Sequence, residues 1–143
     1  NMTKQIFISS DHGGFKLKEK IYEYLLSKKY YIKNLGPSKL ITVDYPDFAG
    51  LLANEILKEK DSFGMLFCGT GIGISIAANR FSHIRAALCT DVNMALLSRK
   101  HNNANVLVMG GRTTRLKLAK NIALVFLETE FEHGRHEKRV NKL

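Results

Sequence analysis

Tryptophan is absent from the 143-residue sequence, and proline and cysteine occur only twice each. The two cysteines, Cys68 and Cys89, form no C-x-x-C pair and no His/Cys cluster at metal-ligand spacing, so neither a disulfide framework nor a zinc site is indicated. The longest apolar run near the end covers 122–127, far short of the roughly 20 residues that span a bilayer. No signal peptide pattern opens the chain. We therefore expect a cytoplasmic protein with reduced thiols that binds neither a membrane nor a metal.

Acidic residues are outnumbered, because 22 Lys and Arg face 13 Asp and Glu, and the formal net charge is +9. Such a charge favours an anionic partner, either nucleic acid or a phosphorylated small molecule. No Arg/Lys stripe is interleaved with aromatic residues, which argues against nucleic acid. We interpret most lysines of the first predicted helix as a solvated face: Lys16, Lys18, Lys20, Lys28 and Lys29. A small phosphorylated substrate is the remaining expectation.

Short apolar segments alternate with amphipathic ones along the whole chain. Strands are predicted near 5–9, 30–35, 63–68, 86–89 and 106–109, and helices near 15–27, 45–60, 76–81, 90–101 and 113–128. The second of these helices is expected to bury Phe48, Leu51, Leu52 and Ile56. Strands that each precede a helix predict an α/β fold, a Rossmann-like three-layer sandwich whose five-stranded parallel sheet is flanked by helices. We expect a single domain over 1–143, with a tail over about 130–143 that extends from the last helix.

The segment Phe67–Ser75 carries three glycines at alternate positions between an apolar strand and a helix. It lacks the lysine of a Walker loop, and Ile74 stands where a dinucleotide fingerprint needs its third glycine, although Asp91 lies at about the right distance for a ribose carboxylate. One interpretation is an anion hole beside the thiol of Cys68. The other is a plain turn beside a buried structural cysteine.

The topology separates two groups of candidate residues. Ligands of parallel sheets bind outside the carboxyl ends of the strands, where we expect Asp11, His12, Cys68 and Arg112. His101 and Asn102 end a crossover helix and are expected at the opposite edge, as are the arginines of the tail. They form either a polar helix C-cap or part of the site of a second subunit.

Several motifs together resemble the ribose-5-phosphate isomerase B family, also called the LacA/RpiB family, over nearly the whole chain. They are Asp11-His12-Gly13-Gly14, Asp44-Tyr45-Pro46, Cys68-Gly69-Thr70-Gly71-Ile72-Gly73, Ser98-Arg99-Lys100-His101-Asn102 and Gly134-Arg135-His136 with Arg139. The resemblance implies interconversion of ribose 5-phosphate and ribulose 5-phosphate in the pentose phosphate pathway, with no metal or cofactor. It also implies a homodimer with composite active sites, or a higher oligomer.

The resemblance assigns catalytic roles to three side chains. Cys68 is the base, Thr70 hydrogen-bonds the thiol or the substrate, and His101 is the acid/base for ring opening, with Asn102 beside it from the partner subunit. Some family members carry a glutamate base a few positions further on, where this chain has Ile74-Ser75-Ile76, which supports the cysteine variant. The backbone N–H groups expected to bind the enediolate belong to Gly69, Gly71, Ile72 and Gly73.

The same resemblance assigns the substrate contacts. Asp11 holds sugar hydroxyls, while His12, Arg135 and Arg139 clamp the phosphate and Arg112 is a further binding candidate. Tyr45 either lines the pocket or packs in a turn. His83, His133 and Cys89 receive no role.

Three alternatives stay open at this point. One is the same reaction on a hexose such as galactose 6-phosphate; the resemblance implies that the heteromeric enzymes of that kind divide their catalytic residues between two chains, whereas this chain carries the complete set. The second is a phosphate-sensing module without turnover, and the third is a nucleic-acid binder whose binding falls with salt.

Overall fold

The fold is seen in a computed structural model, which describes residues 3–143. Its elements are β1 (Gln5–Ser10), α1 (Phe15–Ser27), β2 (Tyr31–Gly36), α2 (Tyr45–Lys58), β3 (Phe63–Cys68), α3 (Ile72–Ala78), β4 (Ala86–Leu88), α4 (Val92–Lys100), β5 (Val106–Gly110), α5 (Leu116–Glu128) and α6 (Arg135–Val140). All strand pairs are parallel, in the order β2-β1-β3-β5-β4. The predicted five-stranded parallel sheet is confirmed.

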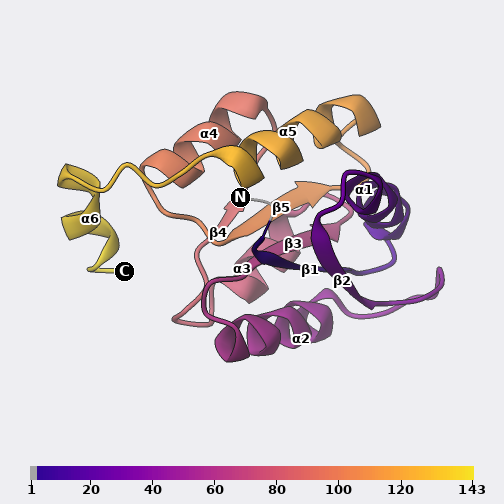
Figure 1. Ribbon diagram of the computed structural model, residues 1–143. Coiled ribbons are helices and arrows are strands. Elements are labelled where there is room, and N and C mark those ends of the chain that lie inside the picture. The colour runs from indigo at the N-terminus through magenta and orange to yellow at the C-terminus, as the bar shows by residue number, and fades with distance from the viewer. Residues whose placement is uncertain (1–2) are drawn as a thin grey trace.

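Helices cover both faces of the sheet, which gives the predicted three layers (Figure 1). On one face α1, α4 and α5 bury a cluster that includes Ile8, Ile21, Met65 and Phe126. On the other face α2 and α3 pack over a second cluster, so the central strand β3 is buried along its whole length. A strand buried on both faces is an uninterrupted apolar run, which is why the sequence pattern located β3 correctly.

Three predicted boundaries differ from the structure. The third helix begins at Ile72 rather than near Ile76, and it ends at Ala78 rather than near Phe81, because the side chain of Asn79 bonds both the N–H and the carbonyl of Ala86 and turns the chain toward β4. The last long helix begins at Leu116 rather than Thr113, since the N–H groups of 113 and 114 bond the carbonyl of Gly110 in a turn. The tail was predicted without a helix but contains α6.

Two burial predictions were wrong. Leu51 on α2 is 48% exposed, and the buried side chains of that helix are Ala49, Leu52, Ala53 and Ile56. Lys18 on α1 is fully buried, although Lys16, Lys20, Lys28 and Lys29 are exposed as predicted.

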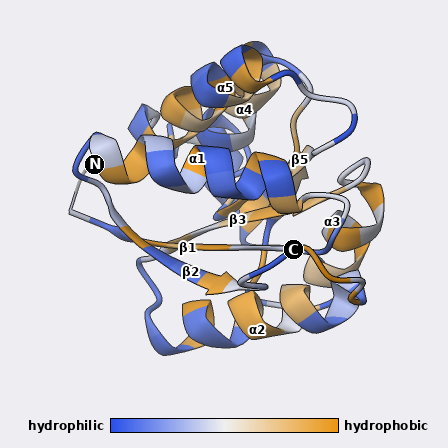
Figure 2. Cartoon of the chain, turned by 90° about the vertical axis from the view of Figure 1, so that its right-hand side faces the viewer, coloured by the Kyte–Doolittle hydropathy of each residue, from blue (hydrophilic) through white to orange (hydrophobic). Residues whose placement is uncertain are grey.

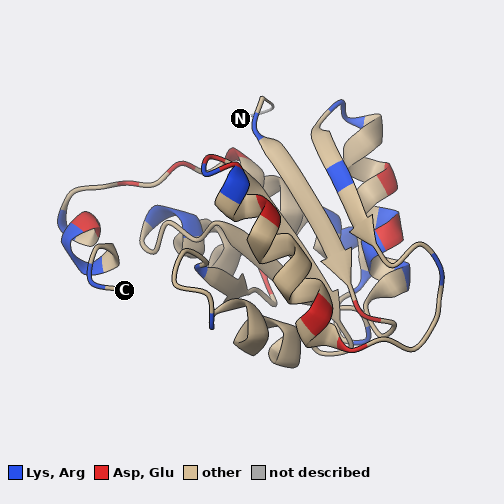
Figure 3. Cartoon of the chain, turned by 90° about the horizontal axis from the view of Figure 1, so that it is seen from below, with Lys and Arg blue, Asp and Glu red and all other residues tan. Residues whose placement is uncertain are grey.

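The tail leaves α5 and runs away from the body of the sheet to α6 (Figure 1). Three of the six residues of α6 are Lys or Arg, and the helix carries several blue segments in Figure 3. None of the helices within residues 3–143 is long and apolar enough to cross a membrane.

Candidate active site

Three loops meet at the carboxyl edge of the sheet, after β1, β3 and β5. Backbone hydrogen bonds join them: Asp11 N–H donates to the Phe67 carbonyl at 3.1 Å, Gly111 N–H to the Cys68 carbonyl at 2.7 Å, and Arg112 N–H to the Gly69 carbonyl at 2.9 Å. The loops are therefore held to one another by backbone groups, which fixes the relative positions of the side chains they carry.

Glycines permit this close approach. A methyl group on Gly14 would lie 2.4 Å from the carbonyl carbon of Phe67, and one on Gly111 would lie 2.5 Å from the carbonyl oxygen of Gly13. Gly71 adopts a φ of 81°, in the left-handed region that residues with a Cβ rarely occupy. The glycine-rich sequence of these loops thus has a packing reason at several positions.

Cys68 is the last residue of β3 and is 5% exposed. Its Sγ accepts a hydrogen bond of 3.1 Å from the N–H of Gly71, as the predicted loop beside the thiol requires. The hydrogen bond fixes the position of the sulfur beside the loop. The Thr70 hydroxyl accepts from the Ile72 N–H at 3.2 Å, and among residues 3–143 no hydrogen bond joins it to the thiol.

The first turn of α3 leaves two backbone donors unused. The N–H groups of Gly73 and Ile74 donate to no other residue among 3–143, whereas those of Gly71 and Ile72 bond within the loop. Of the four N–H groups expected to bind an enediolate, those of Gly69 and Gly73 donate to no other residue among 3–143 and are available, and that of Ile74 was not predicted.

Asp11 and His12 stand beside this loop. The Asp11 carboxylate, 7% exposed, accepts from the Gly14 N–H at 3.1 Å. The Nδ1 atom of His12 lies 3.2 Å from the carbonyl oxygen and 3.4 Å from the nitrogen of Val43, so either tautomer of its ring has a partner there. This anchor from the segment 37–44 has no signal in the sequence.

Two larger side chains lie against the two ends of this glycine loop, Arg112 beside Gly69 and Tyr45 beside Gly73. A methyl group on Gly69 would lie 2.9 Å from Nη1 of Arg112, and one on Gly73 would lie 2.8 Å from Cζ of Tyr45. Both side chains are exposed, so each can contact a ligand above the loop. Asp91 has a different role from a ribose carboxylate: it caps α4, accepting from the Met94 N–H at 2.7 Å.

A second group of predicted residues lies around the end of α4. His101 is the C-cap residue of α4, and with Asn102 and Arg139 it lines a cavity of about 300 Å³ to which no residue of the carboxyl edge contributes. The ring of His101 stacks on His136 with centroids 4.1 Å apart and planes 15° apart. The sequence did not indicate this pairing, which depends on how the tail returns to α4.

His136 is 7% exposed and lies 3.5 Å from the carboxylate of Glu132. Burial lowers the pKa of His136, and the charges of His101 and Arg135 lower it further, while Glu132 opposes the shift. Its imidazole is therefore neutral at physiological pH.

The structure also brings together a possible ligand set that the sequence spacing did not reveal. Ligand atoms of His101, Glu132 and His136 all lie within 4.8 Å of one another. Because the imidazole planes are nearly parallel, the in-plane lone pairs of the two rings do not converge on one point. The cluster is not preorganised for a metal ion.

A family model described as Ribose/Galactose Isomerase matches residues 6–143. Ribose-5-phosphate isomerase B of Escherichia coli (strain K12) is 41% identical over 140 residues, which cover 98% of this chain and 94% of that protein. A solved ribose 5-phosphate isomerase from Thermotoga maritima is 49% identical with a TM-score of 0.95, covering 98% of this chain and 97% of its own.

A further solved structure contains a ligand. It is ribose-5-phosphate isomerase B from Mycoplasma genitalium with bound ribulose-5-phosphate, 42% identical with a TM-score of 0.95, and the match covers 99% of this chain and 95% of that one. Matches of this extent leave no segment of the fold unaccounted for. The chain belongs to the ribose/galactose isomerase family.

Proposed function

We propose that the protein interconverts ribose 5-phosphate and ribulose 5-phosphate through an enediolate, without a metal or another cofactor. The observation that carries the proposal is the Cys68 thiol at the carboxyl edge, which accepts the Gly71 N–H and stands beside unused N–H groups of α3. The ribulose-5-phosphate bound to the Mycoplasma genitalium relative supports the choice of a pentose phosphate.

The chemistry follows from these groups. The Cys68 thiolate removes the proton from carbon 2 of the open-chain aldose, and the carbonyl oxygen on carbon 1 takes the negative charge. The unused N–H groups of Gly73 and Ile74 are suited to stabilise that oxygen. The hydroxyl proton passes from the oxygen on carbon 2 to the oxygen on carbon 1, and sulfur returns its proton to carbon 1, which gives the ketose. His101 acts as the acid/base that opens the sugar ring.

The phosphate requires cations at a distance from the thiol. His12 and Arg112 are available at the carboxyl edge, and Arg135 and Arg139 on α6 line a cavity of about 650 Å³ with Lys138 and Lys142 and no acidic residue. One guanidinium group can bind two phosphate oxygens through two parallel N–H···O hydrogen bonds. The tail therefore supplies the stronger clamp, and Asp11 is left for the sugar hydroxyls.

The two groups of residues meet only if two copies of the chain combine. A helix that crosses over from one parallel strand to the next begins at the carboxyl edge and ends at the opposite edge, so His101 lies away from Cys68 of its own chain. We accordingly propose a homodimer in which one subunit contributes Cys68 and its loop, and the partner contributes the His101 group and the tail arginines.

The surface beside the edge strand β4 fits this partner. α3 and α4 flank β4 on opposite faces of the sheet, and each exposes two large apolar side chains. These are Ile72, Ile76, Met94 and Leu97, with exposed fractions of 54%, 58%, 42% and 36%. Most residues of α3 are coloured as hydrophobic in Figure 2. Exposed apolar side chains on the two helices that flank an edge strand are typical of a protein interface.

One set of assays tests the proposed reaction and the role of Cys68 in it. The intact protein should convert ribose 5-phosphate in the presence of a chelator and should act more slowly on galactose 6-phosphate. Cys68→Ala should lose at least about 100-fold in kcat, and Cys89→Ala, at a buried thiol outside the site, serves as the matched control. No turnover of either sugar by the intact protein would contradict the isomerase assignment.

Mixing tests the composite site. Cys68→Ala and His101→Asn subunits, denatured together and refolded, should regain about a quarter of the native activity, because half of the dimers are mixed and each has one intact site. A mixture as inactive as its two parents would contradict sharing between subunits and leave the isomerase assignment standing.

A further inference from the structure

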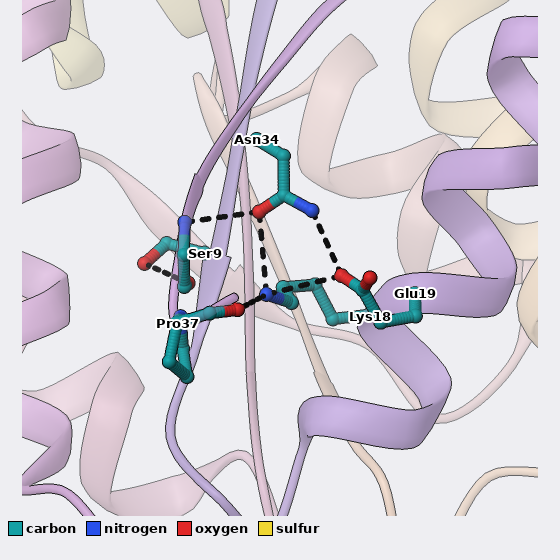
Figure 4. A network of polar contacts seen from close by, with 6 residues as sticks. Ser9, Lys18, Glu19, Asn34 and Pro37 are labelled. Atoms are coloured by element: carbon teal, nitrogen blue, oxygen red, sulfur yellow. Dashed lines mark hydrogen bonds and ion pairs between the residues drawn. The ribbon is translucent and has the colours of Figure 1, made fainter. Parts of the chain in front are cut away.

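Lys18 is 0% exposed and is one of the largest fully buried side chains among residues 3–143. It projects from the first turns of α1 toward the end of β2 rather than into water (Figure 4). A buried charge needs a reason, since an ammonium group loses its hydration when it leaves water. The acceptors of its three N–H groups account for the burial of Lys18.

All three donors of the ammonium group have acceptors. Nζ lies 2.6 Å from the carbonyl oxygen of Pro37, 3.2 Å from Oδ1 of Asn34 and 3.2 Å from the carboxylate of Glu19. Burial lowers the pKa of Lys18, whereas the hydrogen bond and charge of Glu19 raise it. The carboxylate thus offsets part of the cost of burying the ammonium group.

The same network holds the backbone where β2 ends. Asn34 Oδ1 also accepts from the Gly36 N–H at 2.9 Å, and Asn34 Nδ2 donates to Glu19 at 2.8 Å (Figure 4). From β1, the Ser9 hydroxyl donates to the Gly36 carbonyl at 3.2 Å. Lys18 therefore fixes the first residue of the segment 37–44.

The other end of this segment touches the candidate active site. Val43 contacts Nδ1 of His12 through both its nitrogen and its carbonyl oxygen, and Tyr45, which follows at the start of α2, lies against Gly73. Between these ends residues 38–42 are exposed. The segment 37–44 is therefore anchored at both ends, by Lys18 at Pro37 and by His12 at Val43.

We propose that Lys18 is a positioning residue of the isomerase: by holding the carbonyl of Pro37 it sets the path of the segment 37–44, which in turn holds His12 and Tyr45 against the substrate. This inference rests on the proposed function for its effect on catalysis. The anchoring itself depends only on the hydrogen bonds and the ion pair that join Lys18, Asn34, Glu19 and the carbonyl of Pro37. Lys18 does not touch the reacting atoms, so it acts through His12 and Tyr45.

The expected effect is on substrate binding rather than on the chemical step. Lys18→Met keeps the length of the side chain and removes its hydrogen-bond donors. The segment 37–44 then becomes more mobile, and His12, which contacts it, is held less rigidly. Contacts to the phosphate stabilise the bound substrate and the transition state equally, so their loss weakens binding without slowing the chemical step. KM for ribose 5-phosphate should therefore rise about tenfold, with kcat within about twofold of its original value.

Two control variants separate this role from general effects. Lys16→Met removes an exposed charge from the same helix, so it measures any long-range attraction of the phosphate. Ile21→Val or Ile21→Ala, whichever matches the fall in melting temperature of Lys18→Met, measures destabilisation of α1 alone. Neither control should change KM by more than about twofold.

A second readout does not depend on activity. Hydrogen exchange followed by mass spectrometry should be faster for the amides of 36–45 in Lys18→Met, and the NMR signal of His12 Nδ1 should move, while the controls keep both unchanged. If Lys18→Met does not fold, Asn34→Ala, which removes one acceptor and the Gly36 anchor, should give the same pattern at about threefold in KM.

The outcomes are distinct. A raised KM with faster exchange confined to 36–45 supports the proposal. An unchanged KM, an equal rise in a control variant, or unchanged exchange of 36–45 overturns it. If the intact protein has no isomerase activity, the proposed function fails instead, and the exchange and NMR data still decide whether Lys18 anchors the segment.

Discussion

The contact between Gly14 and Phe67 offers a strict test of how the active-site loops are held. Gly14 precedes α1 at a φ of −101°, a conformation open to any residue, so a side chain there meets only a packing obstacle. A Cβ at this position would lie 2.4 Å from the carbonyl carbon and 2.5 Å from the carbonyl oxygen of Phe67. Both are backbone atoms, which a rotamer change cannot move aside.

In Gly14→Ala the loops after β1 and β3 must separate by about 1 Å to restore ordinary contact distances. The same Phe67 carbonyl accepts the Asp11 N–H, so this hydrogen bond lengthens as well. Overpacking of this kind costs about 1–3 kcal/mol of unfolding free energy. Displacement of Asp11 and His12 from the Cys68 loop by about 1 Å should lower kcat/KM roughly 100-fold.

Gly50→Ala is the matched control. Gly50 lies within α2, and the nearest atom to its added methyl group would be Cζ of Phe81 at 3.8 Å, an ordinary contact. Alanine favours the helix, so this variant should gain up to about 1 kcal/mol. Urea unfolding and steady-state kinetics measure both variants. Unfolding free energy and kcat/KM of Gly14→Ala equal to those of the original protein would refute the argument from packing.

Two further predictions concern protonation. Burial raises the pKa of Cys89 to about 11 from 9.0, so the folded protein keeps a proton that the unfolded chain releases, and the unfolding free energy should fall between pH 9 and pH 11. The loss amounts to at most about 2–3 kcal/mol and should disappear in Cys89→Ala, compared by urea unfolding across that range. His136, whose pKa is lowered by burial and by His101, should titrate below 6.5 in an NMR experiment, and the stacking of α6 on His101 should weaken as the pH falls through that value. A midpoint at or above 6.5 would be inconsistent with the buried position of its ring.

Much of the fold was predictable because burial on both faces of a parallel sheet leaves a plain signal. β3 and β5 are continuous apolar runs, β1 has the apolar centre Ile6-Phe7-Ile8, and each strand lies where the pattern located it. The order of the strands was not predictable from the same pattern, since it depends on which apolar faces meet across long separations in sequence. The short helix α6 was missed because six residues without an apolar stripe carry little periodicity.

Lys18 shows how a correct period can still mislead. It lies three positions before Ile21 and seven before Leu25, so it belongs to the buried face of α1 by spacing alone. Its charge nevertheless led to a prediction of exposure. The acceptors that reverse this outcome, at Asn34 and Pro37, are sixteen or more residues away and come close only when β2 is in place.

The sequence predicted which residues lie together at the carboxyl edge, but it did not predict the hydrogen bonds and ring contacts that hold them there. Residues at the carboxyl ends of parallel strands must share an edge, so the topology alone places Asp11 near Cys68. The Val43 anchor of His12, the His136 ring on His101 and the use of the Thr70 hydroxyl by the Ile72 N–H are all set by loop paths. Loop paths here depend on close contacts between glycines, which no spacing in the sequence reveals.

The proposed division of the active site between two subunits would affect how the protein gains activity. The carboxyl-edge loops are bound to one another by backbone hydrogen bonds and to the segment 37–44, so this half is organised within a single subunit. The other half depends on α6, which contacts the body through the His101–His136 stack and the bond from the Glu132 N–H to the Lys100 carbonyl. A rigid loop half and a lightly attached cationic half suit a site completed by association, because the partner can adjust the arginines to the phosphate without disturbing the thiol and its donors.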